Sequence, residues 1–305
     1  MSEREASVEN QAADGTGGVG ASATSATSAT SAASAASVSP AALLDLAHRI
    51  AVQAAEFALA ARRVGVEVAA TKSTPTDIVT ATDRETETLI RSLILAARPD
   101  DGILGEEGIE RFGTSGINWV VDPIDGTVNF LYGIPAWAVS IAVVDGSSEP
   151  GGWTALAGVV ANPVTGEIFE ATAGGGARLG TLDLAVNTGV PLSQALVGTG
   201  FSYSAERRRA QAEVLLELLP RVRDVRRVGS AALDLCALAA GRLDAYYERG
   251  LNPWDHAAGA LIAREAGAQV GGIGGGHESI ELLVAAEPAL YAELTAALRD
   301  AGLDA

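Results

Sequence analysis

The chain has 305 residues, enough for one large or two ordinary domains, and 48% of them are hydrophobic but only 5% aromatic. Its 21 basic and 38 acidic residues leave a net charge of −17. This balance argues against a nucleic-acid-binding surface, because no basic stripe is available to replace the counterions of the phosphates. A site made of carboxylates would also repel an anionic substrate unless bound cations reversed the local field.

The single cysteine, Cys236, excludes an intrachain disulfide framework and a multi-cysteine zinc site. Because it lies in an apolar helical run, we expect it in the core. The first residues lack the apolar stretch of a signal peptide, and no run of about 18 apolar residues follows. We therefore expect a soluble, cytoplasmic protein that has no membrane partner.

Residues 1–39 are rich in Ala, Ser, Thr and Gly, with Ser-Ala-Thr repeats. Such a segment cannot bury enough apolar area to offset the entropy lost on ordering, so we expect a disordered tail. Structure is predicted to begin at Ser39, which suits a helix N-cap, followed by Pro40 at the first helical position. Two domains are expected after the tail, at 40–184 and 185–305.

The first domain is predicted to contain helices followed by strands, from the spacing of its apolar residues. The helices are expected at 40–63 and 81–97, and the strands at 119–121, 138–144, 156–161 and 168–171. A loop at 71–76 joins the helices, and 162–166 has the composition of a hairpin turn.

In the second domain, strands and helices are expected to alternate. The strands are predicted at 197–201, 225–228, 243–247 and 282–285, and the helices at 206–219, 231–240, 253–266 and 288–301. Ser230 and Asn252 are predicted N-caps, and the glycine-rich segment 271–276 is predicted to be a flexible turn. The expected fold class is α/β, with an α+β first half and an α/β second half.

The segment 119–130 reads Trp-Val-Val-Asp-Pro-Ile-Asp-Gly-Thr-Val-Asn-Phe. An apolar, strand-like run is expected to end at Asp122, where Pro123 forces a turn. Asp125 then supplies a second carboxylate and Thr127 a hydroxyl. Two acids three residues apart on a rigid turn suit divalent cations, although an ordinary Asp-Pro and Asp-Gly surface turn would have the same composition.

Other acidic residues gather in separate segments. Glu106 and Glu107 follow an apolar run, Asp83 follows the loop that contains Lys72 and Asp77, and Glu248 and Asp255 lie far downstream. With Asn252 as N-cap, Asp255 falls at the third helical position, where an acid also favours the helix dipole. Taken one at a time, Asp255 reads as a capping acid and Glu106-Glu107 as a solvated loop pair.

Together, the strings Gly-Glu-Glu, Asp-Pro-Ile-Asp-Gly-Thr-Val-Asn-Phe and Trp-Asp-His-Ala-Ala-Gly resemble the inositol monophosphatase family of magnesium-dependent, lithium-sensitive phosphatases. The resemblance runs from about residue 42 to the C-terminus. Lys-Ser-Thr-Pro-Thr-Asp, Leu-Val-Gly-Thr-Gly-Phe and Arg-Arg-Val-Gly-Ser-Ala-Ala-Leu-Asp-Leu-Cys make it most similar to the actinobacterial members. It implies a layered αβαβα sandwich with the site between its two halves, and a homodimer.

The resemblance also implies a set of metal ligands for two or three Mg²⁺ ions. Glu106, Asp122 and the backbone carbonyl of Ile124 would hold the first ion. Asp122, Asp125 and Asp255 would hold the second, with Asp122 bridging the two. A third, weaker ion would lie near Glu106 and the mobile loop that contains Lys72 and Asp77. Hard oxygen ligands of this kind are those that Mg²⁺ prefers.

The reaction implied by the resemblance is hydrolysis of a phosphate monoester by water that the metal ions activate, with no covalent phosphoenzyme. Glu106 and the Thr127 hydroxyl would polarise the water further, and Asp83 would orient Thr127. Gly126 and Thr127, which open a short helix, would offer backbone N–H groups to phosphate oxygens.

On the substrate side, the resemblance implies that Glu248 accepts a hydrogen bond from a ring hydroxyl of a polyol. Gly229, Ser230 and Ala231 match a backbone stretch at the same subsite, and Asp255 also reaches the substrate. The segment after Ala268 departs from the family pattern, because it is short and glycine-rich. The loop at 109–118 is also short, which could alter access to the site.

His256 lies beside Asp255 and could be read as a general acid. The family motif varies at this position, so we expect His256 to be a helix-surface residue instead. Trp254 is expected to form a wall of the site.

The leading function is hydrolysis of inositol 1-phosphate or a similar polyol monophosphate. Histidinol phosphate, fructose 1,6-bisphosphate and 3′-phosphoadenosine 5′-phosphate are alternative substrates within the same superfamily. A regulatory interaction protein on the same fold is the alternative from another class. The complete set of Glu106, Asp122, Asp125, Thr127 and Asp255 argues against loss of the chemistry.

Overall fold

A computed structural model describes residues 39–66, 68–71, 78–147, 151–273 and 276–303. Residues 1–38 of the predicted tail (1–39) and the loop residues from Lys72 to Asp77 lie outside these residues, so both expectations remain predictions. No helix in the described part of the chain is long and apolar enough to cross a membrane.

The helices lie close to the predicted positions. They are α1 (Pro40–Val64), α2 (Ala81–Ala97), α3 (Thr127–Tyr132), α4 (Ala205–Leu218), α5 (Ala231–Ala239), α6 (Pro253–Glu265) and α7 (Pro288–Asp300), with short 3₁₀ turns η1 (Leu192–Gln194) and η2 (Leu219–Arg221). The predicted caps are confirmed: Ser39 Oγ accepts the Ala42 N–H, and Ser230 Oγ accepts the Leu233 N–H. These bonds satisfy donors that the first helical turn leaves without partners.

Two sheets and one hairpin carry the strands. The larger sheet has the order β3-β4-β5-β6-β7-β8-β9, and only β3 and β4 are parallel. Its strands are β3 (Gly102–Gly105), β4 (Ile117–Asp125), β5 (Ala138–Gly146), β6 (Trp153–Asn162), β7 (Glu167–Thr172), β8 (Gly176–Leu179) and β9 (Leu182–Asp183). The hairpin consists of β1 (Val68–Thr71) and β2 (Ile78–Thr80).

The smaller sheet lies in the second half of the chain and has the order β11-β10-β12-β14-β13. Its strands are β10 (Leu196–Thr199), β11 (Asp224–Arg226), β12 (Ala245–Glu248), β13 (Gln269–Gly271) and β14 (Leu283–Ala286). Strand β10 pairs in parallel with β11 and β12, whereas β14 runs antiparallel to β12 and β13. A mainly antiparallel first sheet and a mixed second sheet with crossover helices confirm the expected fold class.

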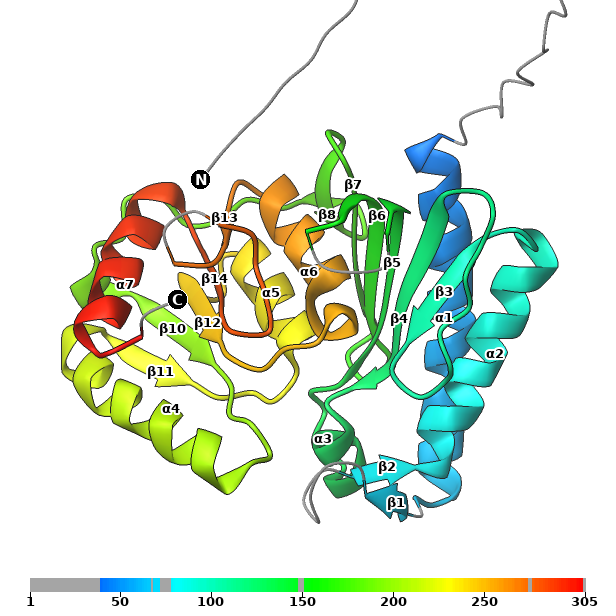
Figure 1. Ribbon diagram of the computed structural model, residues 1–305, viewed down its shortest axis with the longest axis horizontal. Helices are drawn as coiled ribbons and strands as arrows, with labels where there is room; N and C mark the ends of the chain where they lie inside the picture. Colours follow the sequence, from blue (N-terminus) through cyan, green and yellow to red (C-terminus); the bar gives the residue numbers. More distant parts are fainter. Residues whose placement is uncertain (1–38, 67, 72–77, 148–150, 274–275, 304–305) are drawn as a thin grey trace, which may run out of the picture. The chain divides into compact units, whose positions relative to one another are not determined.

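Five layers stack in the order α4/α7, smaller sheet, α5/α6, larger sheet and α1/α2 (Figure 1). Three large apolar clusters fill the spaces between these layers. The middle cluster is rich in alanine from α5 and α6, and it includes Cys236, which is fully buried as predicted. Small side chains let these helices approach both sheets closely, so the predicted αβαβα sandwich is confirmed.

Some boundaries differ from the predictions. Strand β4 does not end at Asp122 but continues to Asp125, and Pro123 lies in a bulge rather than in a turn. Gly271 ends a strand instead of lying in the predicted turn. Strand β10 stops at Thr199, two residues early. Short strands such as β8 and β13 were not predicted, because strands of three or four residues are too short to show a periodic pattern. The division into two domains at residue 184 stays a prediction.

Candidate metal and phosphate site

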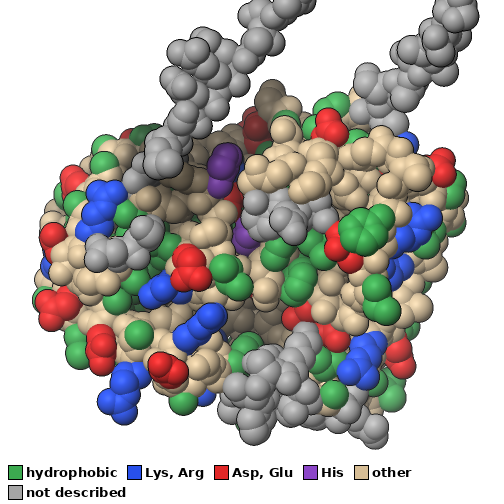
Figure 2. All heavy atoms as spheres, in the orientation of Figure 1, with side chains coloured by type: hydrophobic (Ala, Val, Ile, Leu, Met, Phe, Trp, Pro, Cys, Tyr) green, Lys and Arg blue, Asp and Glu red, His purple; other side chains and the backbone are tan. Residues whose placement is uncertain are grey.

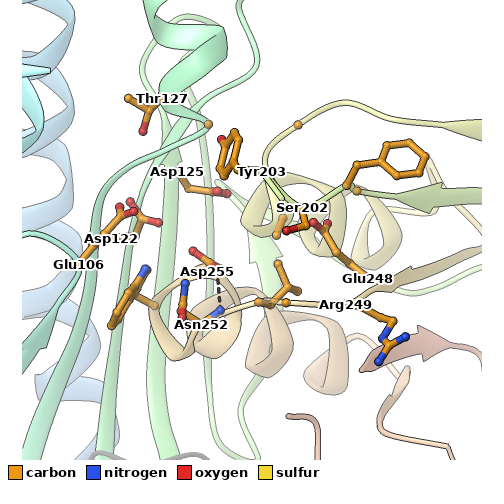
Figure 3. Close-up of a pocket in the computed structure, with 18 of the residues that line it drawn as sticks. Glu106, Asp122, Asp125, Thr127, Ser202, Tyr203, Glu248, Arg249, Asn252 and Asp255 are labelled. Carbon is orange, nitrogen blue, oxygen red and sulfur yellow. Dashed lines mark hydrogen bonds between the residues drawn. The ribbon is translucent and has the colours of Figure 1, made fainter. Parts of the chain in front are cut away.

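Three carboxylates converge where strand β4 ends and helix α6 begins. Asp122, Asp125 and Asp255 each offer an oxygen, and these oxygens all lie within 4.8 Å of one another. Glu106, just after β3, points toward the same place (Figure 3). Strands β3 and β4 are parallel neighbours, so their carboxyl ends meet at one edge of the sheet. The fold therefore brings together the acids that the sequence places in separate segments.

These acids line one side of a cavity of about 220 Å³. The cavity is lined by Glu106, Asp122, Ile124, Asp125, Gly126, Thr127, Gly200, Phe201, Ser202, Tyr203, Arg227, Gly229, Ala231, Glu248, Arg249, Gly250, Leu251, Asn252, Trp254 and Asp255. Glu248 and Ser202 face the acids from the other side (Figure 3). A pocket between the two sheets thus carries carboxylates on opposite walls.

A bulge in β4 explains why two acids three residues apart act together. Asp122 pairs with Ser140 of β5, whereas Asp125 pairs with Ala138, so β4 contains one extra residue. In a regular strand, residues three apart point to opposite faces. The extra residue restores the same face for Asp122 and Asp125. The Ile124 N–H also donates to Asp122 Oδ1 at 3.0 Å, which stabilises the bulge.

Asp125 is anchored to the second half of the chain. Its Oδ2 accepts the Ser230 hydroxyl at 2.6 Å and the Ala232 N–H at 2.8 Å. Both donors belong to the start of α5, where the helix dipole favours a negative charge. These bonds occupy one carboxylate oxygen. Ser230 was predicted as a cap and as part of a backbone subsite, and the structure adds this contact with Asp125, which the sequence did not indicate.

Asp255 is both a helix-capping acid and a member of the acidic cluster, the two interpretations that the sequence left open. Its Oδ2 accepts the Asn252 N–H at 2.6 Å, which completes a capping box at the start of α6. The same carboxylate belongs to the acidic cluster. Capping orients the side chain, because it fixes one oxygen against the backbone.

Asp83 and Thr127 also meet, as the resemblance implies. Thr127 Oγ1 lies 3.2 Å from Asp83 Oδ1 and 3.2 Å from the Ile124 carbonyl oxygen. The other oxygen of Asp83 accepts the Thr80 N–H at 2.9 Å in the capping box of α2. Gly126 precedes Thr127 with φ +96°, and a Cβ there would lie 3.0 Å from the Ala136 carbonyl oxygen. Glycine is therefore required at this sharp turn.

Burial and mutual repulsion make the acidic cluster unfavourable without a cation. Burial raises the pKa of Asp122 well above its usual value, and the nearby charges of Glu106 and Asp125 raise it further. Burial also raises the pKa of Asp125 to about 6, although the hydrogen bond from Ser230 acts to lower it. Buried like charges at this separation are stable when a cation neutralises them. A set of carboxylate oxygens fits a hard divalent ion such as Mg²⁺.

The opposite wall of the cavity is built around Glu248, at the end of β12. The Tyr246 hydroxyl donates to Glu248 Oε2 at 2.5 Å. Burial raises the pKa of Glu248 to about 7, whereas this hydrogen bond and the charge of Arg227 act in the other direction. Gly229 and Ala231 line the cavity as expected. Arg227, another lining residue, was not singled out from the sequence.

The loop that carries Glu106 rests on Glu87, a residue that the sequence analysis missed. Glu87 is buried in α2, accepts the Glu107 N–H at 2.7 Å and pairs with Arg91 at 2.6 Å. A Cβ at Gly105 would lie 2.5 Å from Glu87 Oε1, so the glycine leaves room for the carboxylate. Glu87 lies three and seven residues before Ile90 and Ile94, on the apolar face of the helix, and a charge at that position is the signal that could have identified it.

The prediction for His256 is wrong. The residue is 1% exposed and therefore lies in the interior, not on the helix surface. Neither ring nitrogen has a hydrogen-bond partner among the described residues. Burial lowers the pKa of His256 to about 4. His256 also does not line the cavity, whereas its neighbour Trp254 does.

Charged side chains on the visible face do not form a basic stripe. Lys and Arg are scattered among acidic residues there (Figure 2).

Comparisons with known proteins indicate the family of the chain. A sequence profile of the inositol monophosphatase family matches residues 40–303. The chain is 52% identical to the "Inositol-1-monophosphatase" of Mycobacterium leprae over 244 residues, which cover 75% of this chain and 80% of that protein. It is 38% identical to "Nus factor SuhB" of Salmonella typhimurium over 261 residues, which cover 81% of this chain and 95% of that protein.

Among solved structures, "Mycobacterium tuberculosis SuhB" matches with a TM-score of 0.73 and 46% identity, covering 87% of this chain and 99% of that one. The profile match includes every helix and strand described above. The chain therefore belongs to the inositol monophosphatase family of phosphatases.

Proposed function

We propose that the protein is a Mg²⁺-dependent phosphomonoesterase that hydrolyses inositol 1-phosphate, or a similar polyol monophosphate, to the polyol and phosphate. One observation carries the proposal: the buried cluster of Asp122, Asp125 and Asp255 faces Glu248 across a single cavity. Cations bound by the cluster would attract the phosphate group, and Glu248 would accept a hydrogen bond from a hydroxyl of the polyol.

The proposed ligands are the carboxylates of Glu106, Asp122, Asp125 and Asp255 with the carbonyl oxygen of Ile124. These groups would hold two Mg²⁺ ions, with Asp122 as a ligand of both, and a third ion would bind near Glu106. When bound, the ions supply positive charge that lowers the pKa of water and neutralises the phosphate oxygens.

The chain's own groups then handle the proton and orient the phosphate. Glu106 is proposed to accept a proton from the attacking water, and Thr127 Oγ1 to orient that water by accepting a hydrogen bond from it. The water oxygen bonds to phosphorus as the ester P–O bond breaks, and the polyol oxygen leaves with the bonding electrons and takes up a proton from solvent. Asp83 accepts a hydrogen bond from Thr127 and so fixes the direction of its hydroxyl. Backbone N–H groups of Gly126 and Thr127 are proposed to donate to phosphate oxygens.

Phosphate release from a substrate panel, with and without Mg²⁺, tests the proposal. The panel contains inositol 1-phosphate, histidinol phosphate, fructose 1,6-bisphosphate and 3′-phosphoadenosine 5′-phosphate. We expect the highest kcat/KM for inositol 1-phosphate, with activity lost in EDTA and inhibited by lithium. Slowest turnover of inositol 1-phosphate would instead favour one of the other substrates.

A regulatory interaction protein is the second candidate, and the relatives named "Nus factor SuhB" favour it. The complete carboxylate cluster supports retained chemistry, because an interaction surface does not need buried like charges. A purified protein that releases no phosphate from any substrate in the panel, with Mg²⁺ present, would support this candidate instead.

We also propose a homodimer in the cytoplasm. Light scattering of the purified protein should give twice the mass of 30.9 kDa that the sequence predicts. A mass of one chain would contradict the dimer without affecting the proposed chemistry.

A further inference from the structure

Gly200 lies directly after strand β10, beside the end of β12. The two strands are parallel, with Gly198 opposite Tyr246 and Thr199 opposite Tyr247. One further step in this register brings Gly200 next to Glu248. Both residues line the cavity.

Glycine at this position leaves space that the Glu248 carboxylate occupies. A Cβ on Gly200 would lie 2.0 Å from Oε2, 2.1 Å from Cδ and 2.1 Å from Oε1 of Glu248. These are the three nearest atoms, and all belong to the end of one flexible side chain. A methyl group would therefore displace the carboxylate before it disturbed any backbone atom.

The backbone does not explain the glycine. Gly200 is not among the described glycines with a positive φ, so another residue could adopt its conformation. Two positions earlier, within β10, a Cβ on Gly198 would lie 2.8 Å from Leu243 Cδ1 and 3.1 Å from Tyr246 Cδ2. Alternate residues of a strand share a face. The two glycines thus leave room for Tyr246 and for the Glu248 carboxylate to which its hydroxyl donates.

We propose that Gly200 is a specificity-determining residue. Because it has no side chain, the Glu248 carboxylate can occupy the adjacent space and stay at the position where the polyol hydroxyls would bind. This rests on the proposed function, in which Glu248 reads the polyol. Gly200 acts through Glu248, so it is a positioning residue and takes no part in the chemical step.

A double-mutant cycle tests the proposal. We would measure kcat and KM of wild type, Gly200→Ala, Glu248→Ala and the double variant with Mg²⁺. The substrates are inositol 1-phosphate and p-nitrophenyl phosphate, which carries no polyol. Gly200→Ala should raise KM for inositol 1-phosphate about tenfold to a hundredfold, the range for one lost hydrogen bond to a charged group. The loss for p-nitrophenyl phosphate should be smaller, and Gly200→Ala should have no further effect in the Glu248→Ala background.

Gly276→Ala is the matched control. Gly276 lies outside the cavity lining, and an added methyl group there meets nothing within 4 Å. It should leave both substrates unaffected. Thermal unfolding of each variant separates misfolding from misplacement of Glu248. A Gly200→Ala protein that unfolds only when Glu248 is present would also support the coupling, since the methyl group would then act through that side chain.

Equal losses on both substrates, or an effect of Gly200→Ala that persists without Glu248, would overturn the inference. A Glu248→Ala protein that discriminates between the substrates as wild type does would overturn the polyol role of Glu248 as well. If Glu248→Ala raises the KM for inositol 1-phosphate but Gly200→Ala does not, the role of Gly200 is rejected and that of Glu248 stands.

Discussion

At Asp125 one carboxylate serves two purposes. Its Oδ2 accepts hydrogen bonds from Ser230 and Ala232, and it also belongs to the cluster with Asp122 and Asp255. Asparagine keeps the shape and an acceptor oxygen but removes the charge. Asp125→Asn should therefore separate packing from cation binding.

We expect Asp125→Asn to lower kcat/KM in Mg²⁺ by about a hundredfold or more. Removing a residue that only hydrogen-bonds to a metal ligand already costs tenfold to a hundredfold, and loss of a ligand itself should cost at least as much. Without Mg²⁺, its free energy of unfolding at pH 7 should rise by about 1–3 kcal/mol, because a buried carboxylate with a raised pKa is removed. Phosphate release and urea denaturation measure the two effects.

Asp145→Asn is the control for this variant. Asp145 lies at the other end of β5, is exposed, and pairs with Ile117 far along the β4–β5 ladder from Asp125. Neither activity nor stability should change. Unchanged activity of Asp125→Asn in Mg²⁺ would mean that the proposed metal chemistry is wrong.

His256 makes a different contribution, to the pH dependence of stability. Burial lowers its pKa to about 4, whereas an unfolded histidine titrates near 6.5. Between these values the unfolded chain binds more protons, so stability falls as pH falls through this window. The total loss is about 3 kcal/mol, from about 1.4 kcal/mol for each unit of pKa difference.

Urea denaturation of wild type and His256→Gln at pH 7 and pH 4 isolates the contribution of His256 to this loss of stability. The wild type should lose more stability between the two values than the variant does. His277→Gln, which removes an exposed imidazole, is the control. Equal losses in wild type and His256→Gln would show that the buried imidazole does not resist protonation.

At the scale of elements, helix α2 supports the end of strand β3. Glu87 accepts the Glu107 N–H and occupies the space left by Gly105 and Gly108. Its contact with the loop therefore fixes where Glu106 enters the carboxylate cluster. The helix acts on the proposed metal site without contributing a ligand from this position.

Glu87→Ala should raise the Mg²⁺ concentration for half-maximal activity about tenfold to a hundredfold, as loss of a group that orients a metal ligand does. A magnesium titration of phosphate release measures it. Glu85→Ala changes an exposed acid on the same helix and should have no effect. An unchanged magnesium requirement in folded Glu87→Ala would show that the loop holds Glu106 by itself.

At the scale of the whole molecule, the family match and the described structure begin almost together, at residues 40 and 39. A chain without residues 1–38 should keep its Mg²⁺-dependent activity and its thermal stability, because the site and all three large apolar clusters lie downstream. Thermal unfolding and phosphate release check this. A loss of activity in the shortened chain would assign the predicted tail a role.

Much of the fold follows from local patterns. Ser39, Ser230 and Asn252 were predicted as N-caps, and each begins a helix in the structure. A helix start depends on residues within one turn, so neighbouring sequence is sufficient to predict it. The short strands β8 and β13 were missed, because three or four residues show no periodic pattern, and hydrogen bonding to a neighbouring strand is what defines them.

The sequence by itself determined which residues carry the carboxylates and that Asp122, Asp125 and Asp255 could hold a cation. The tertiary structure decided how they meet: the bulge in β4 turns two acids to one face, and α5 anchors Asp125. It also decided that His256 is buried and that Gly200 makes room for Glu248. The physical reason is that side-chain chemistry is local, whereas burial and close approach depend on elements far apart in the chain.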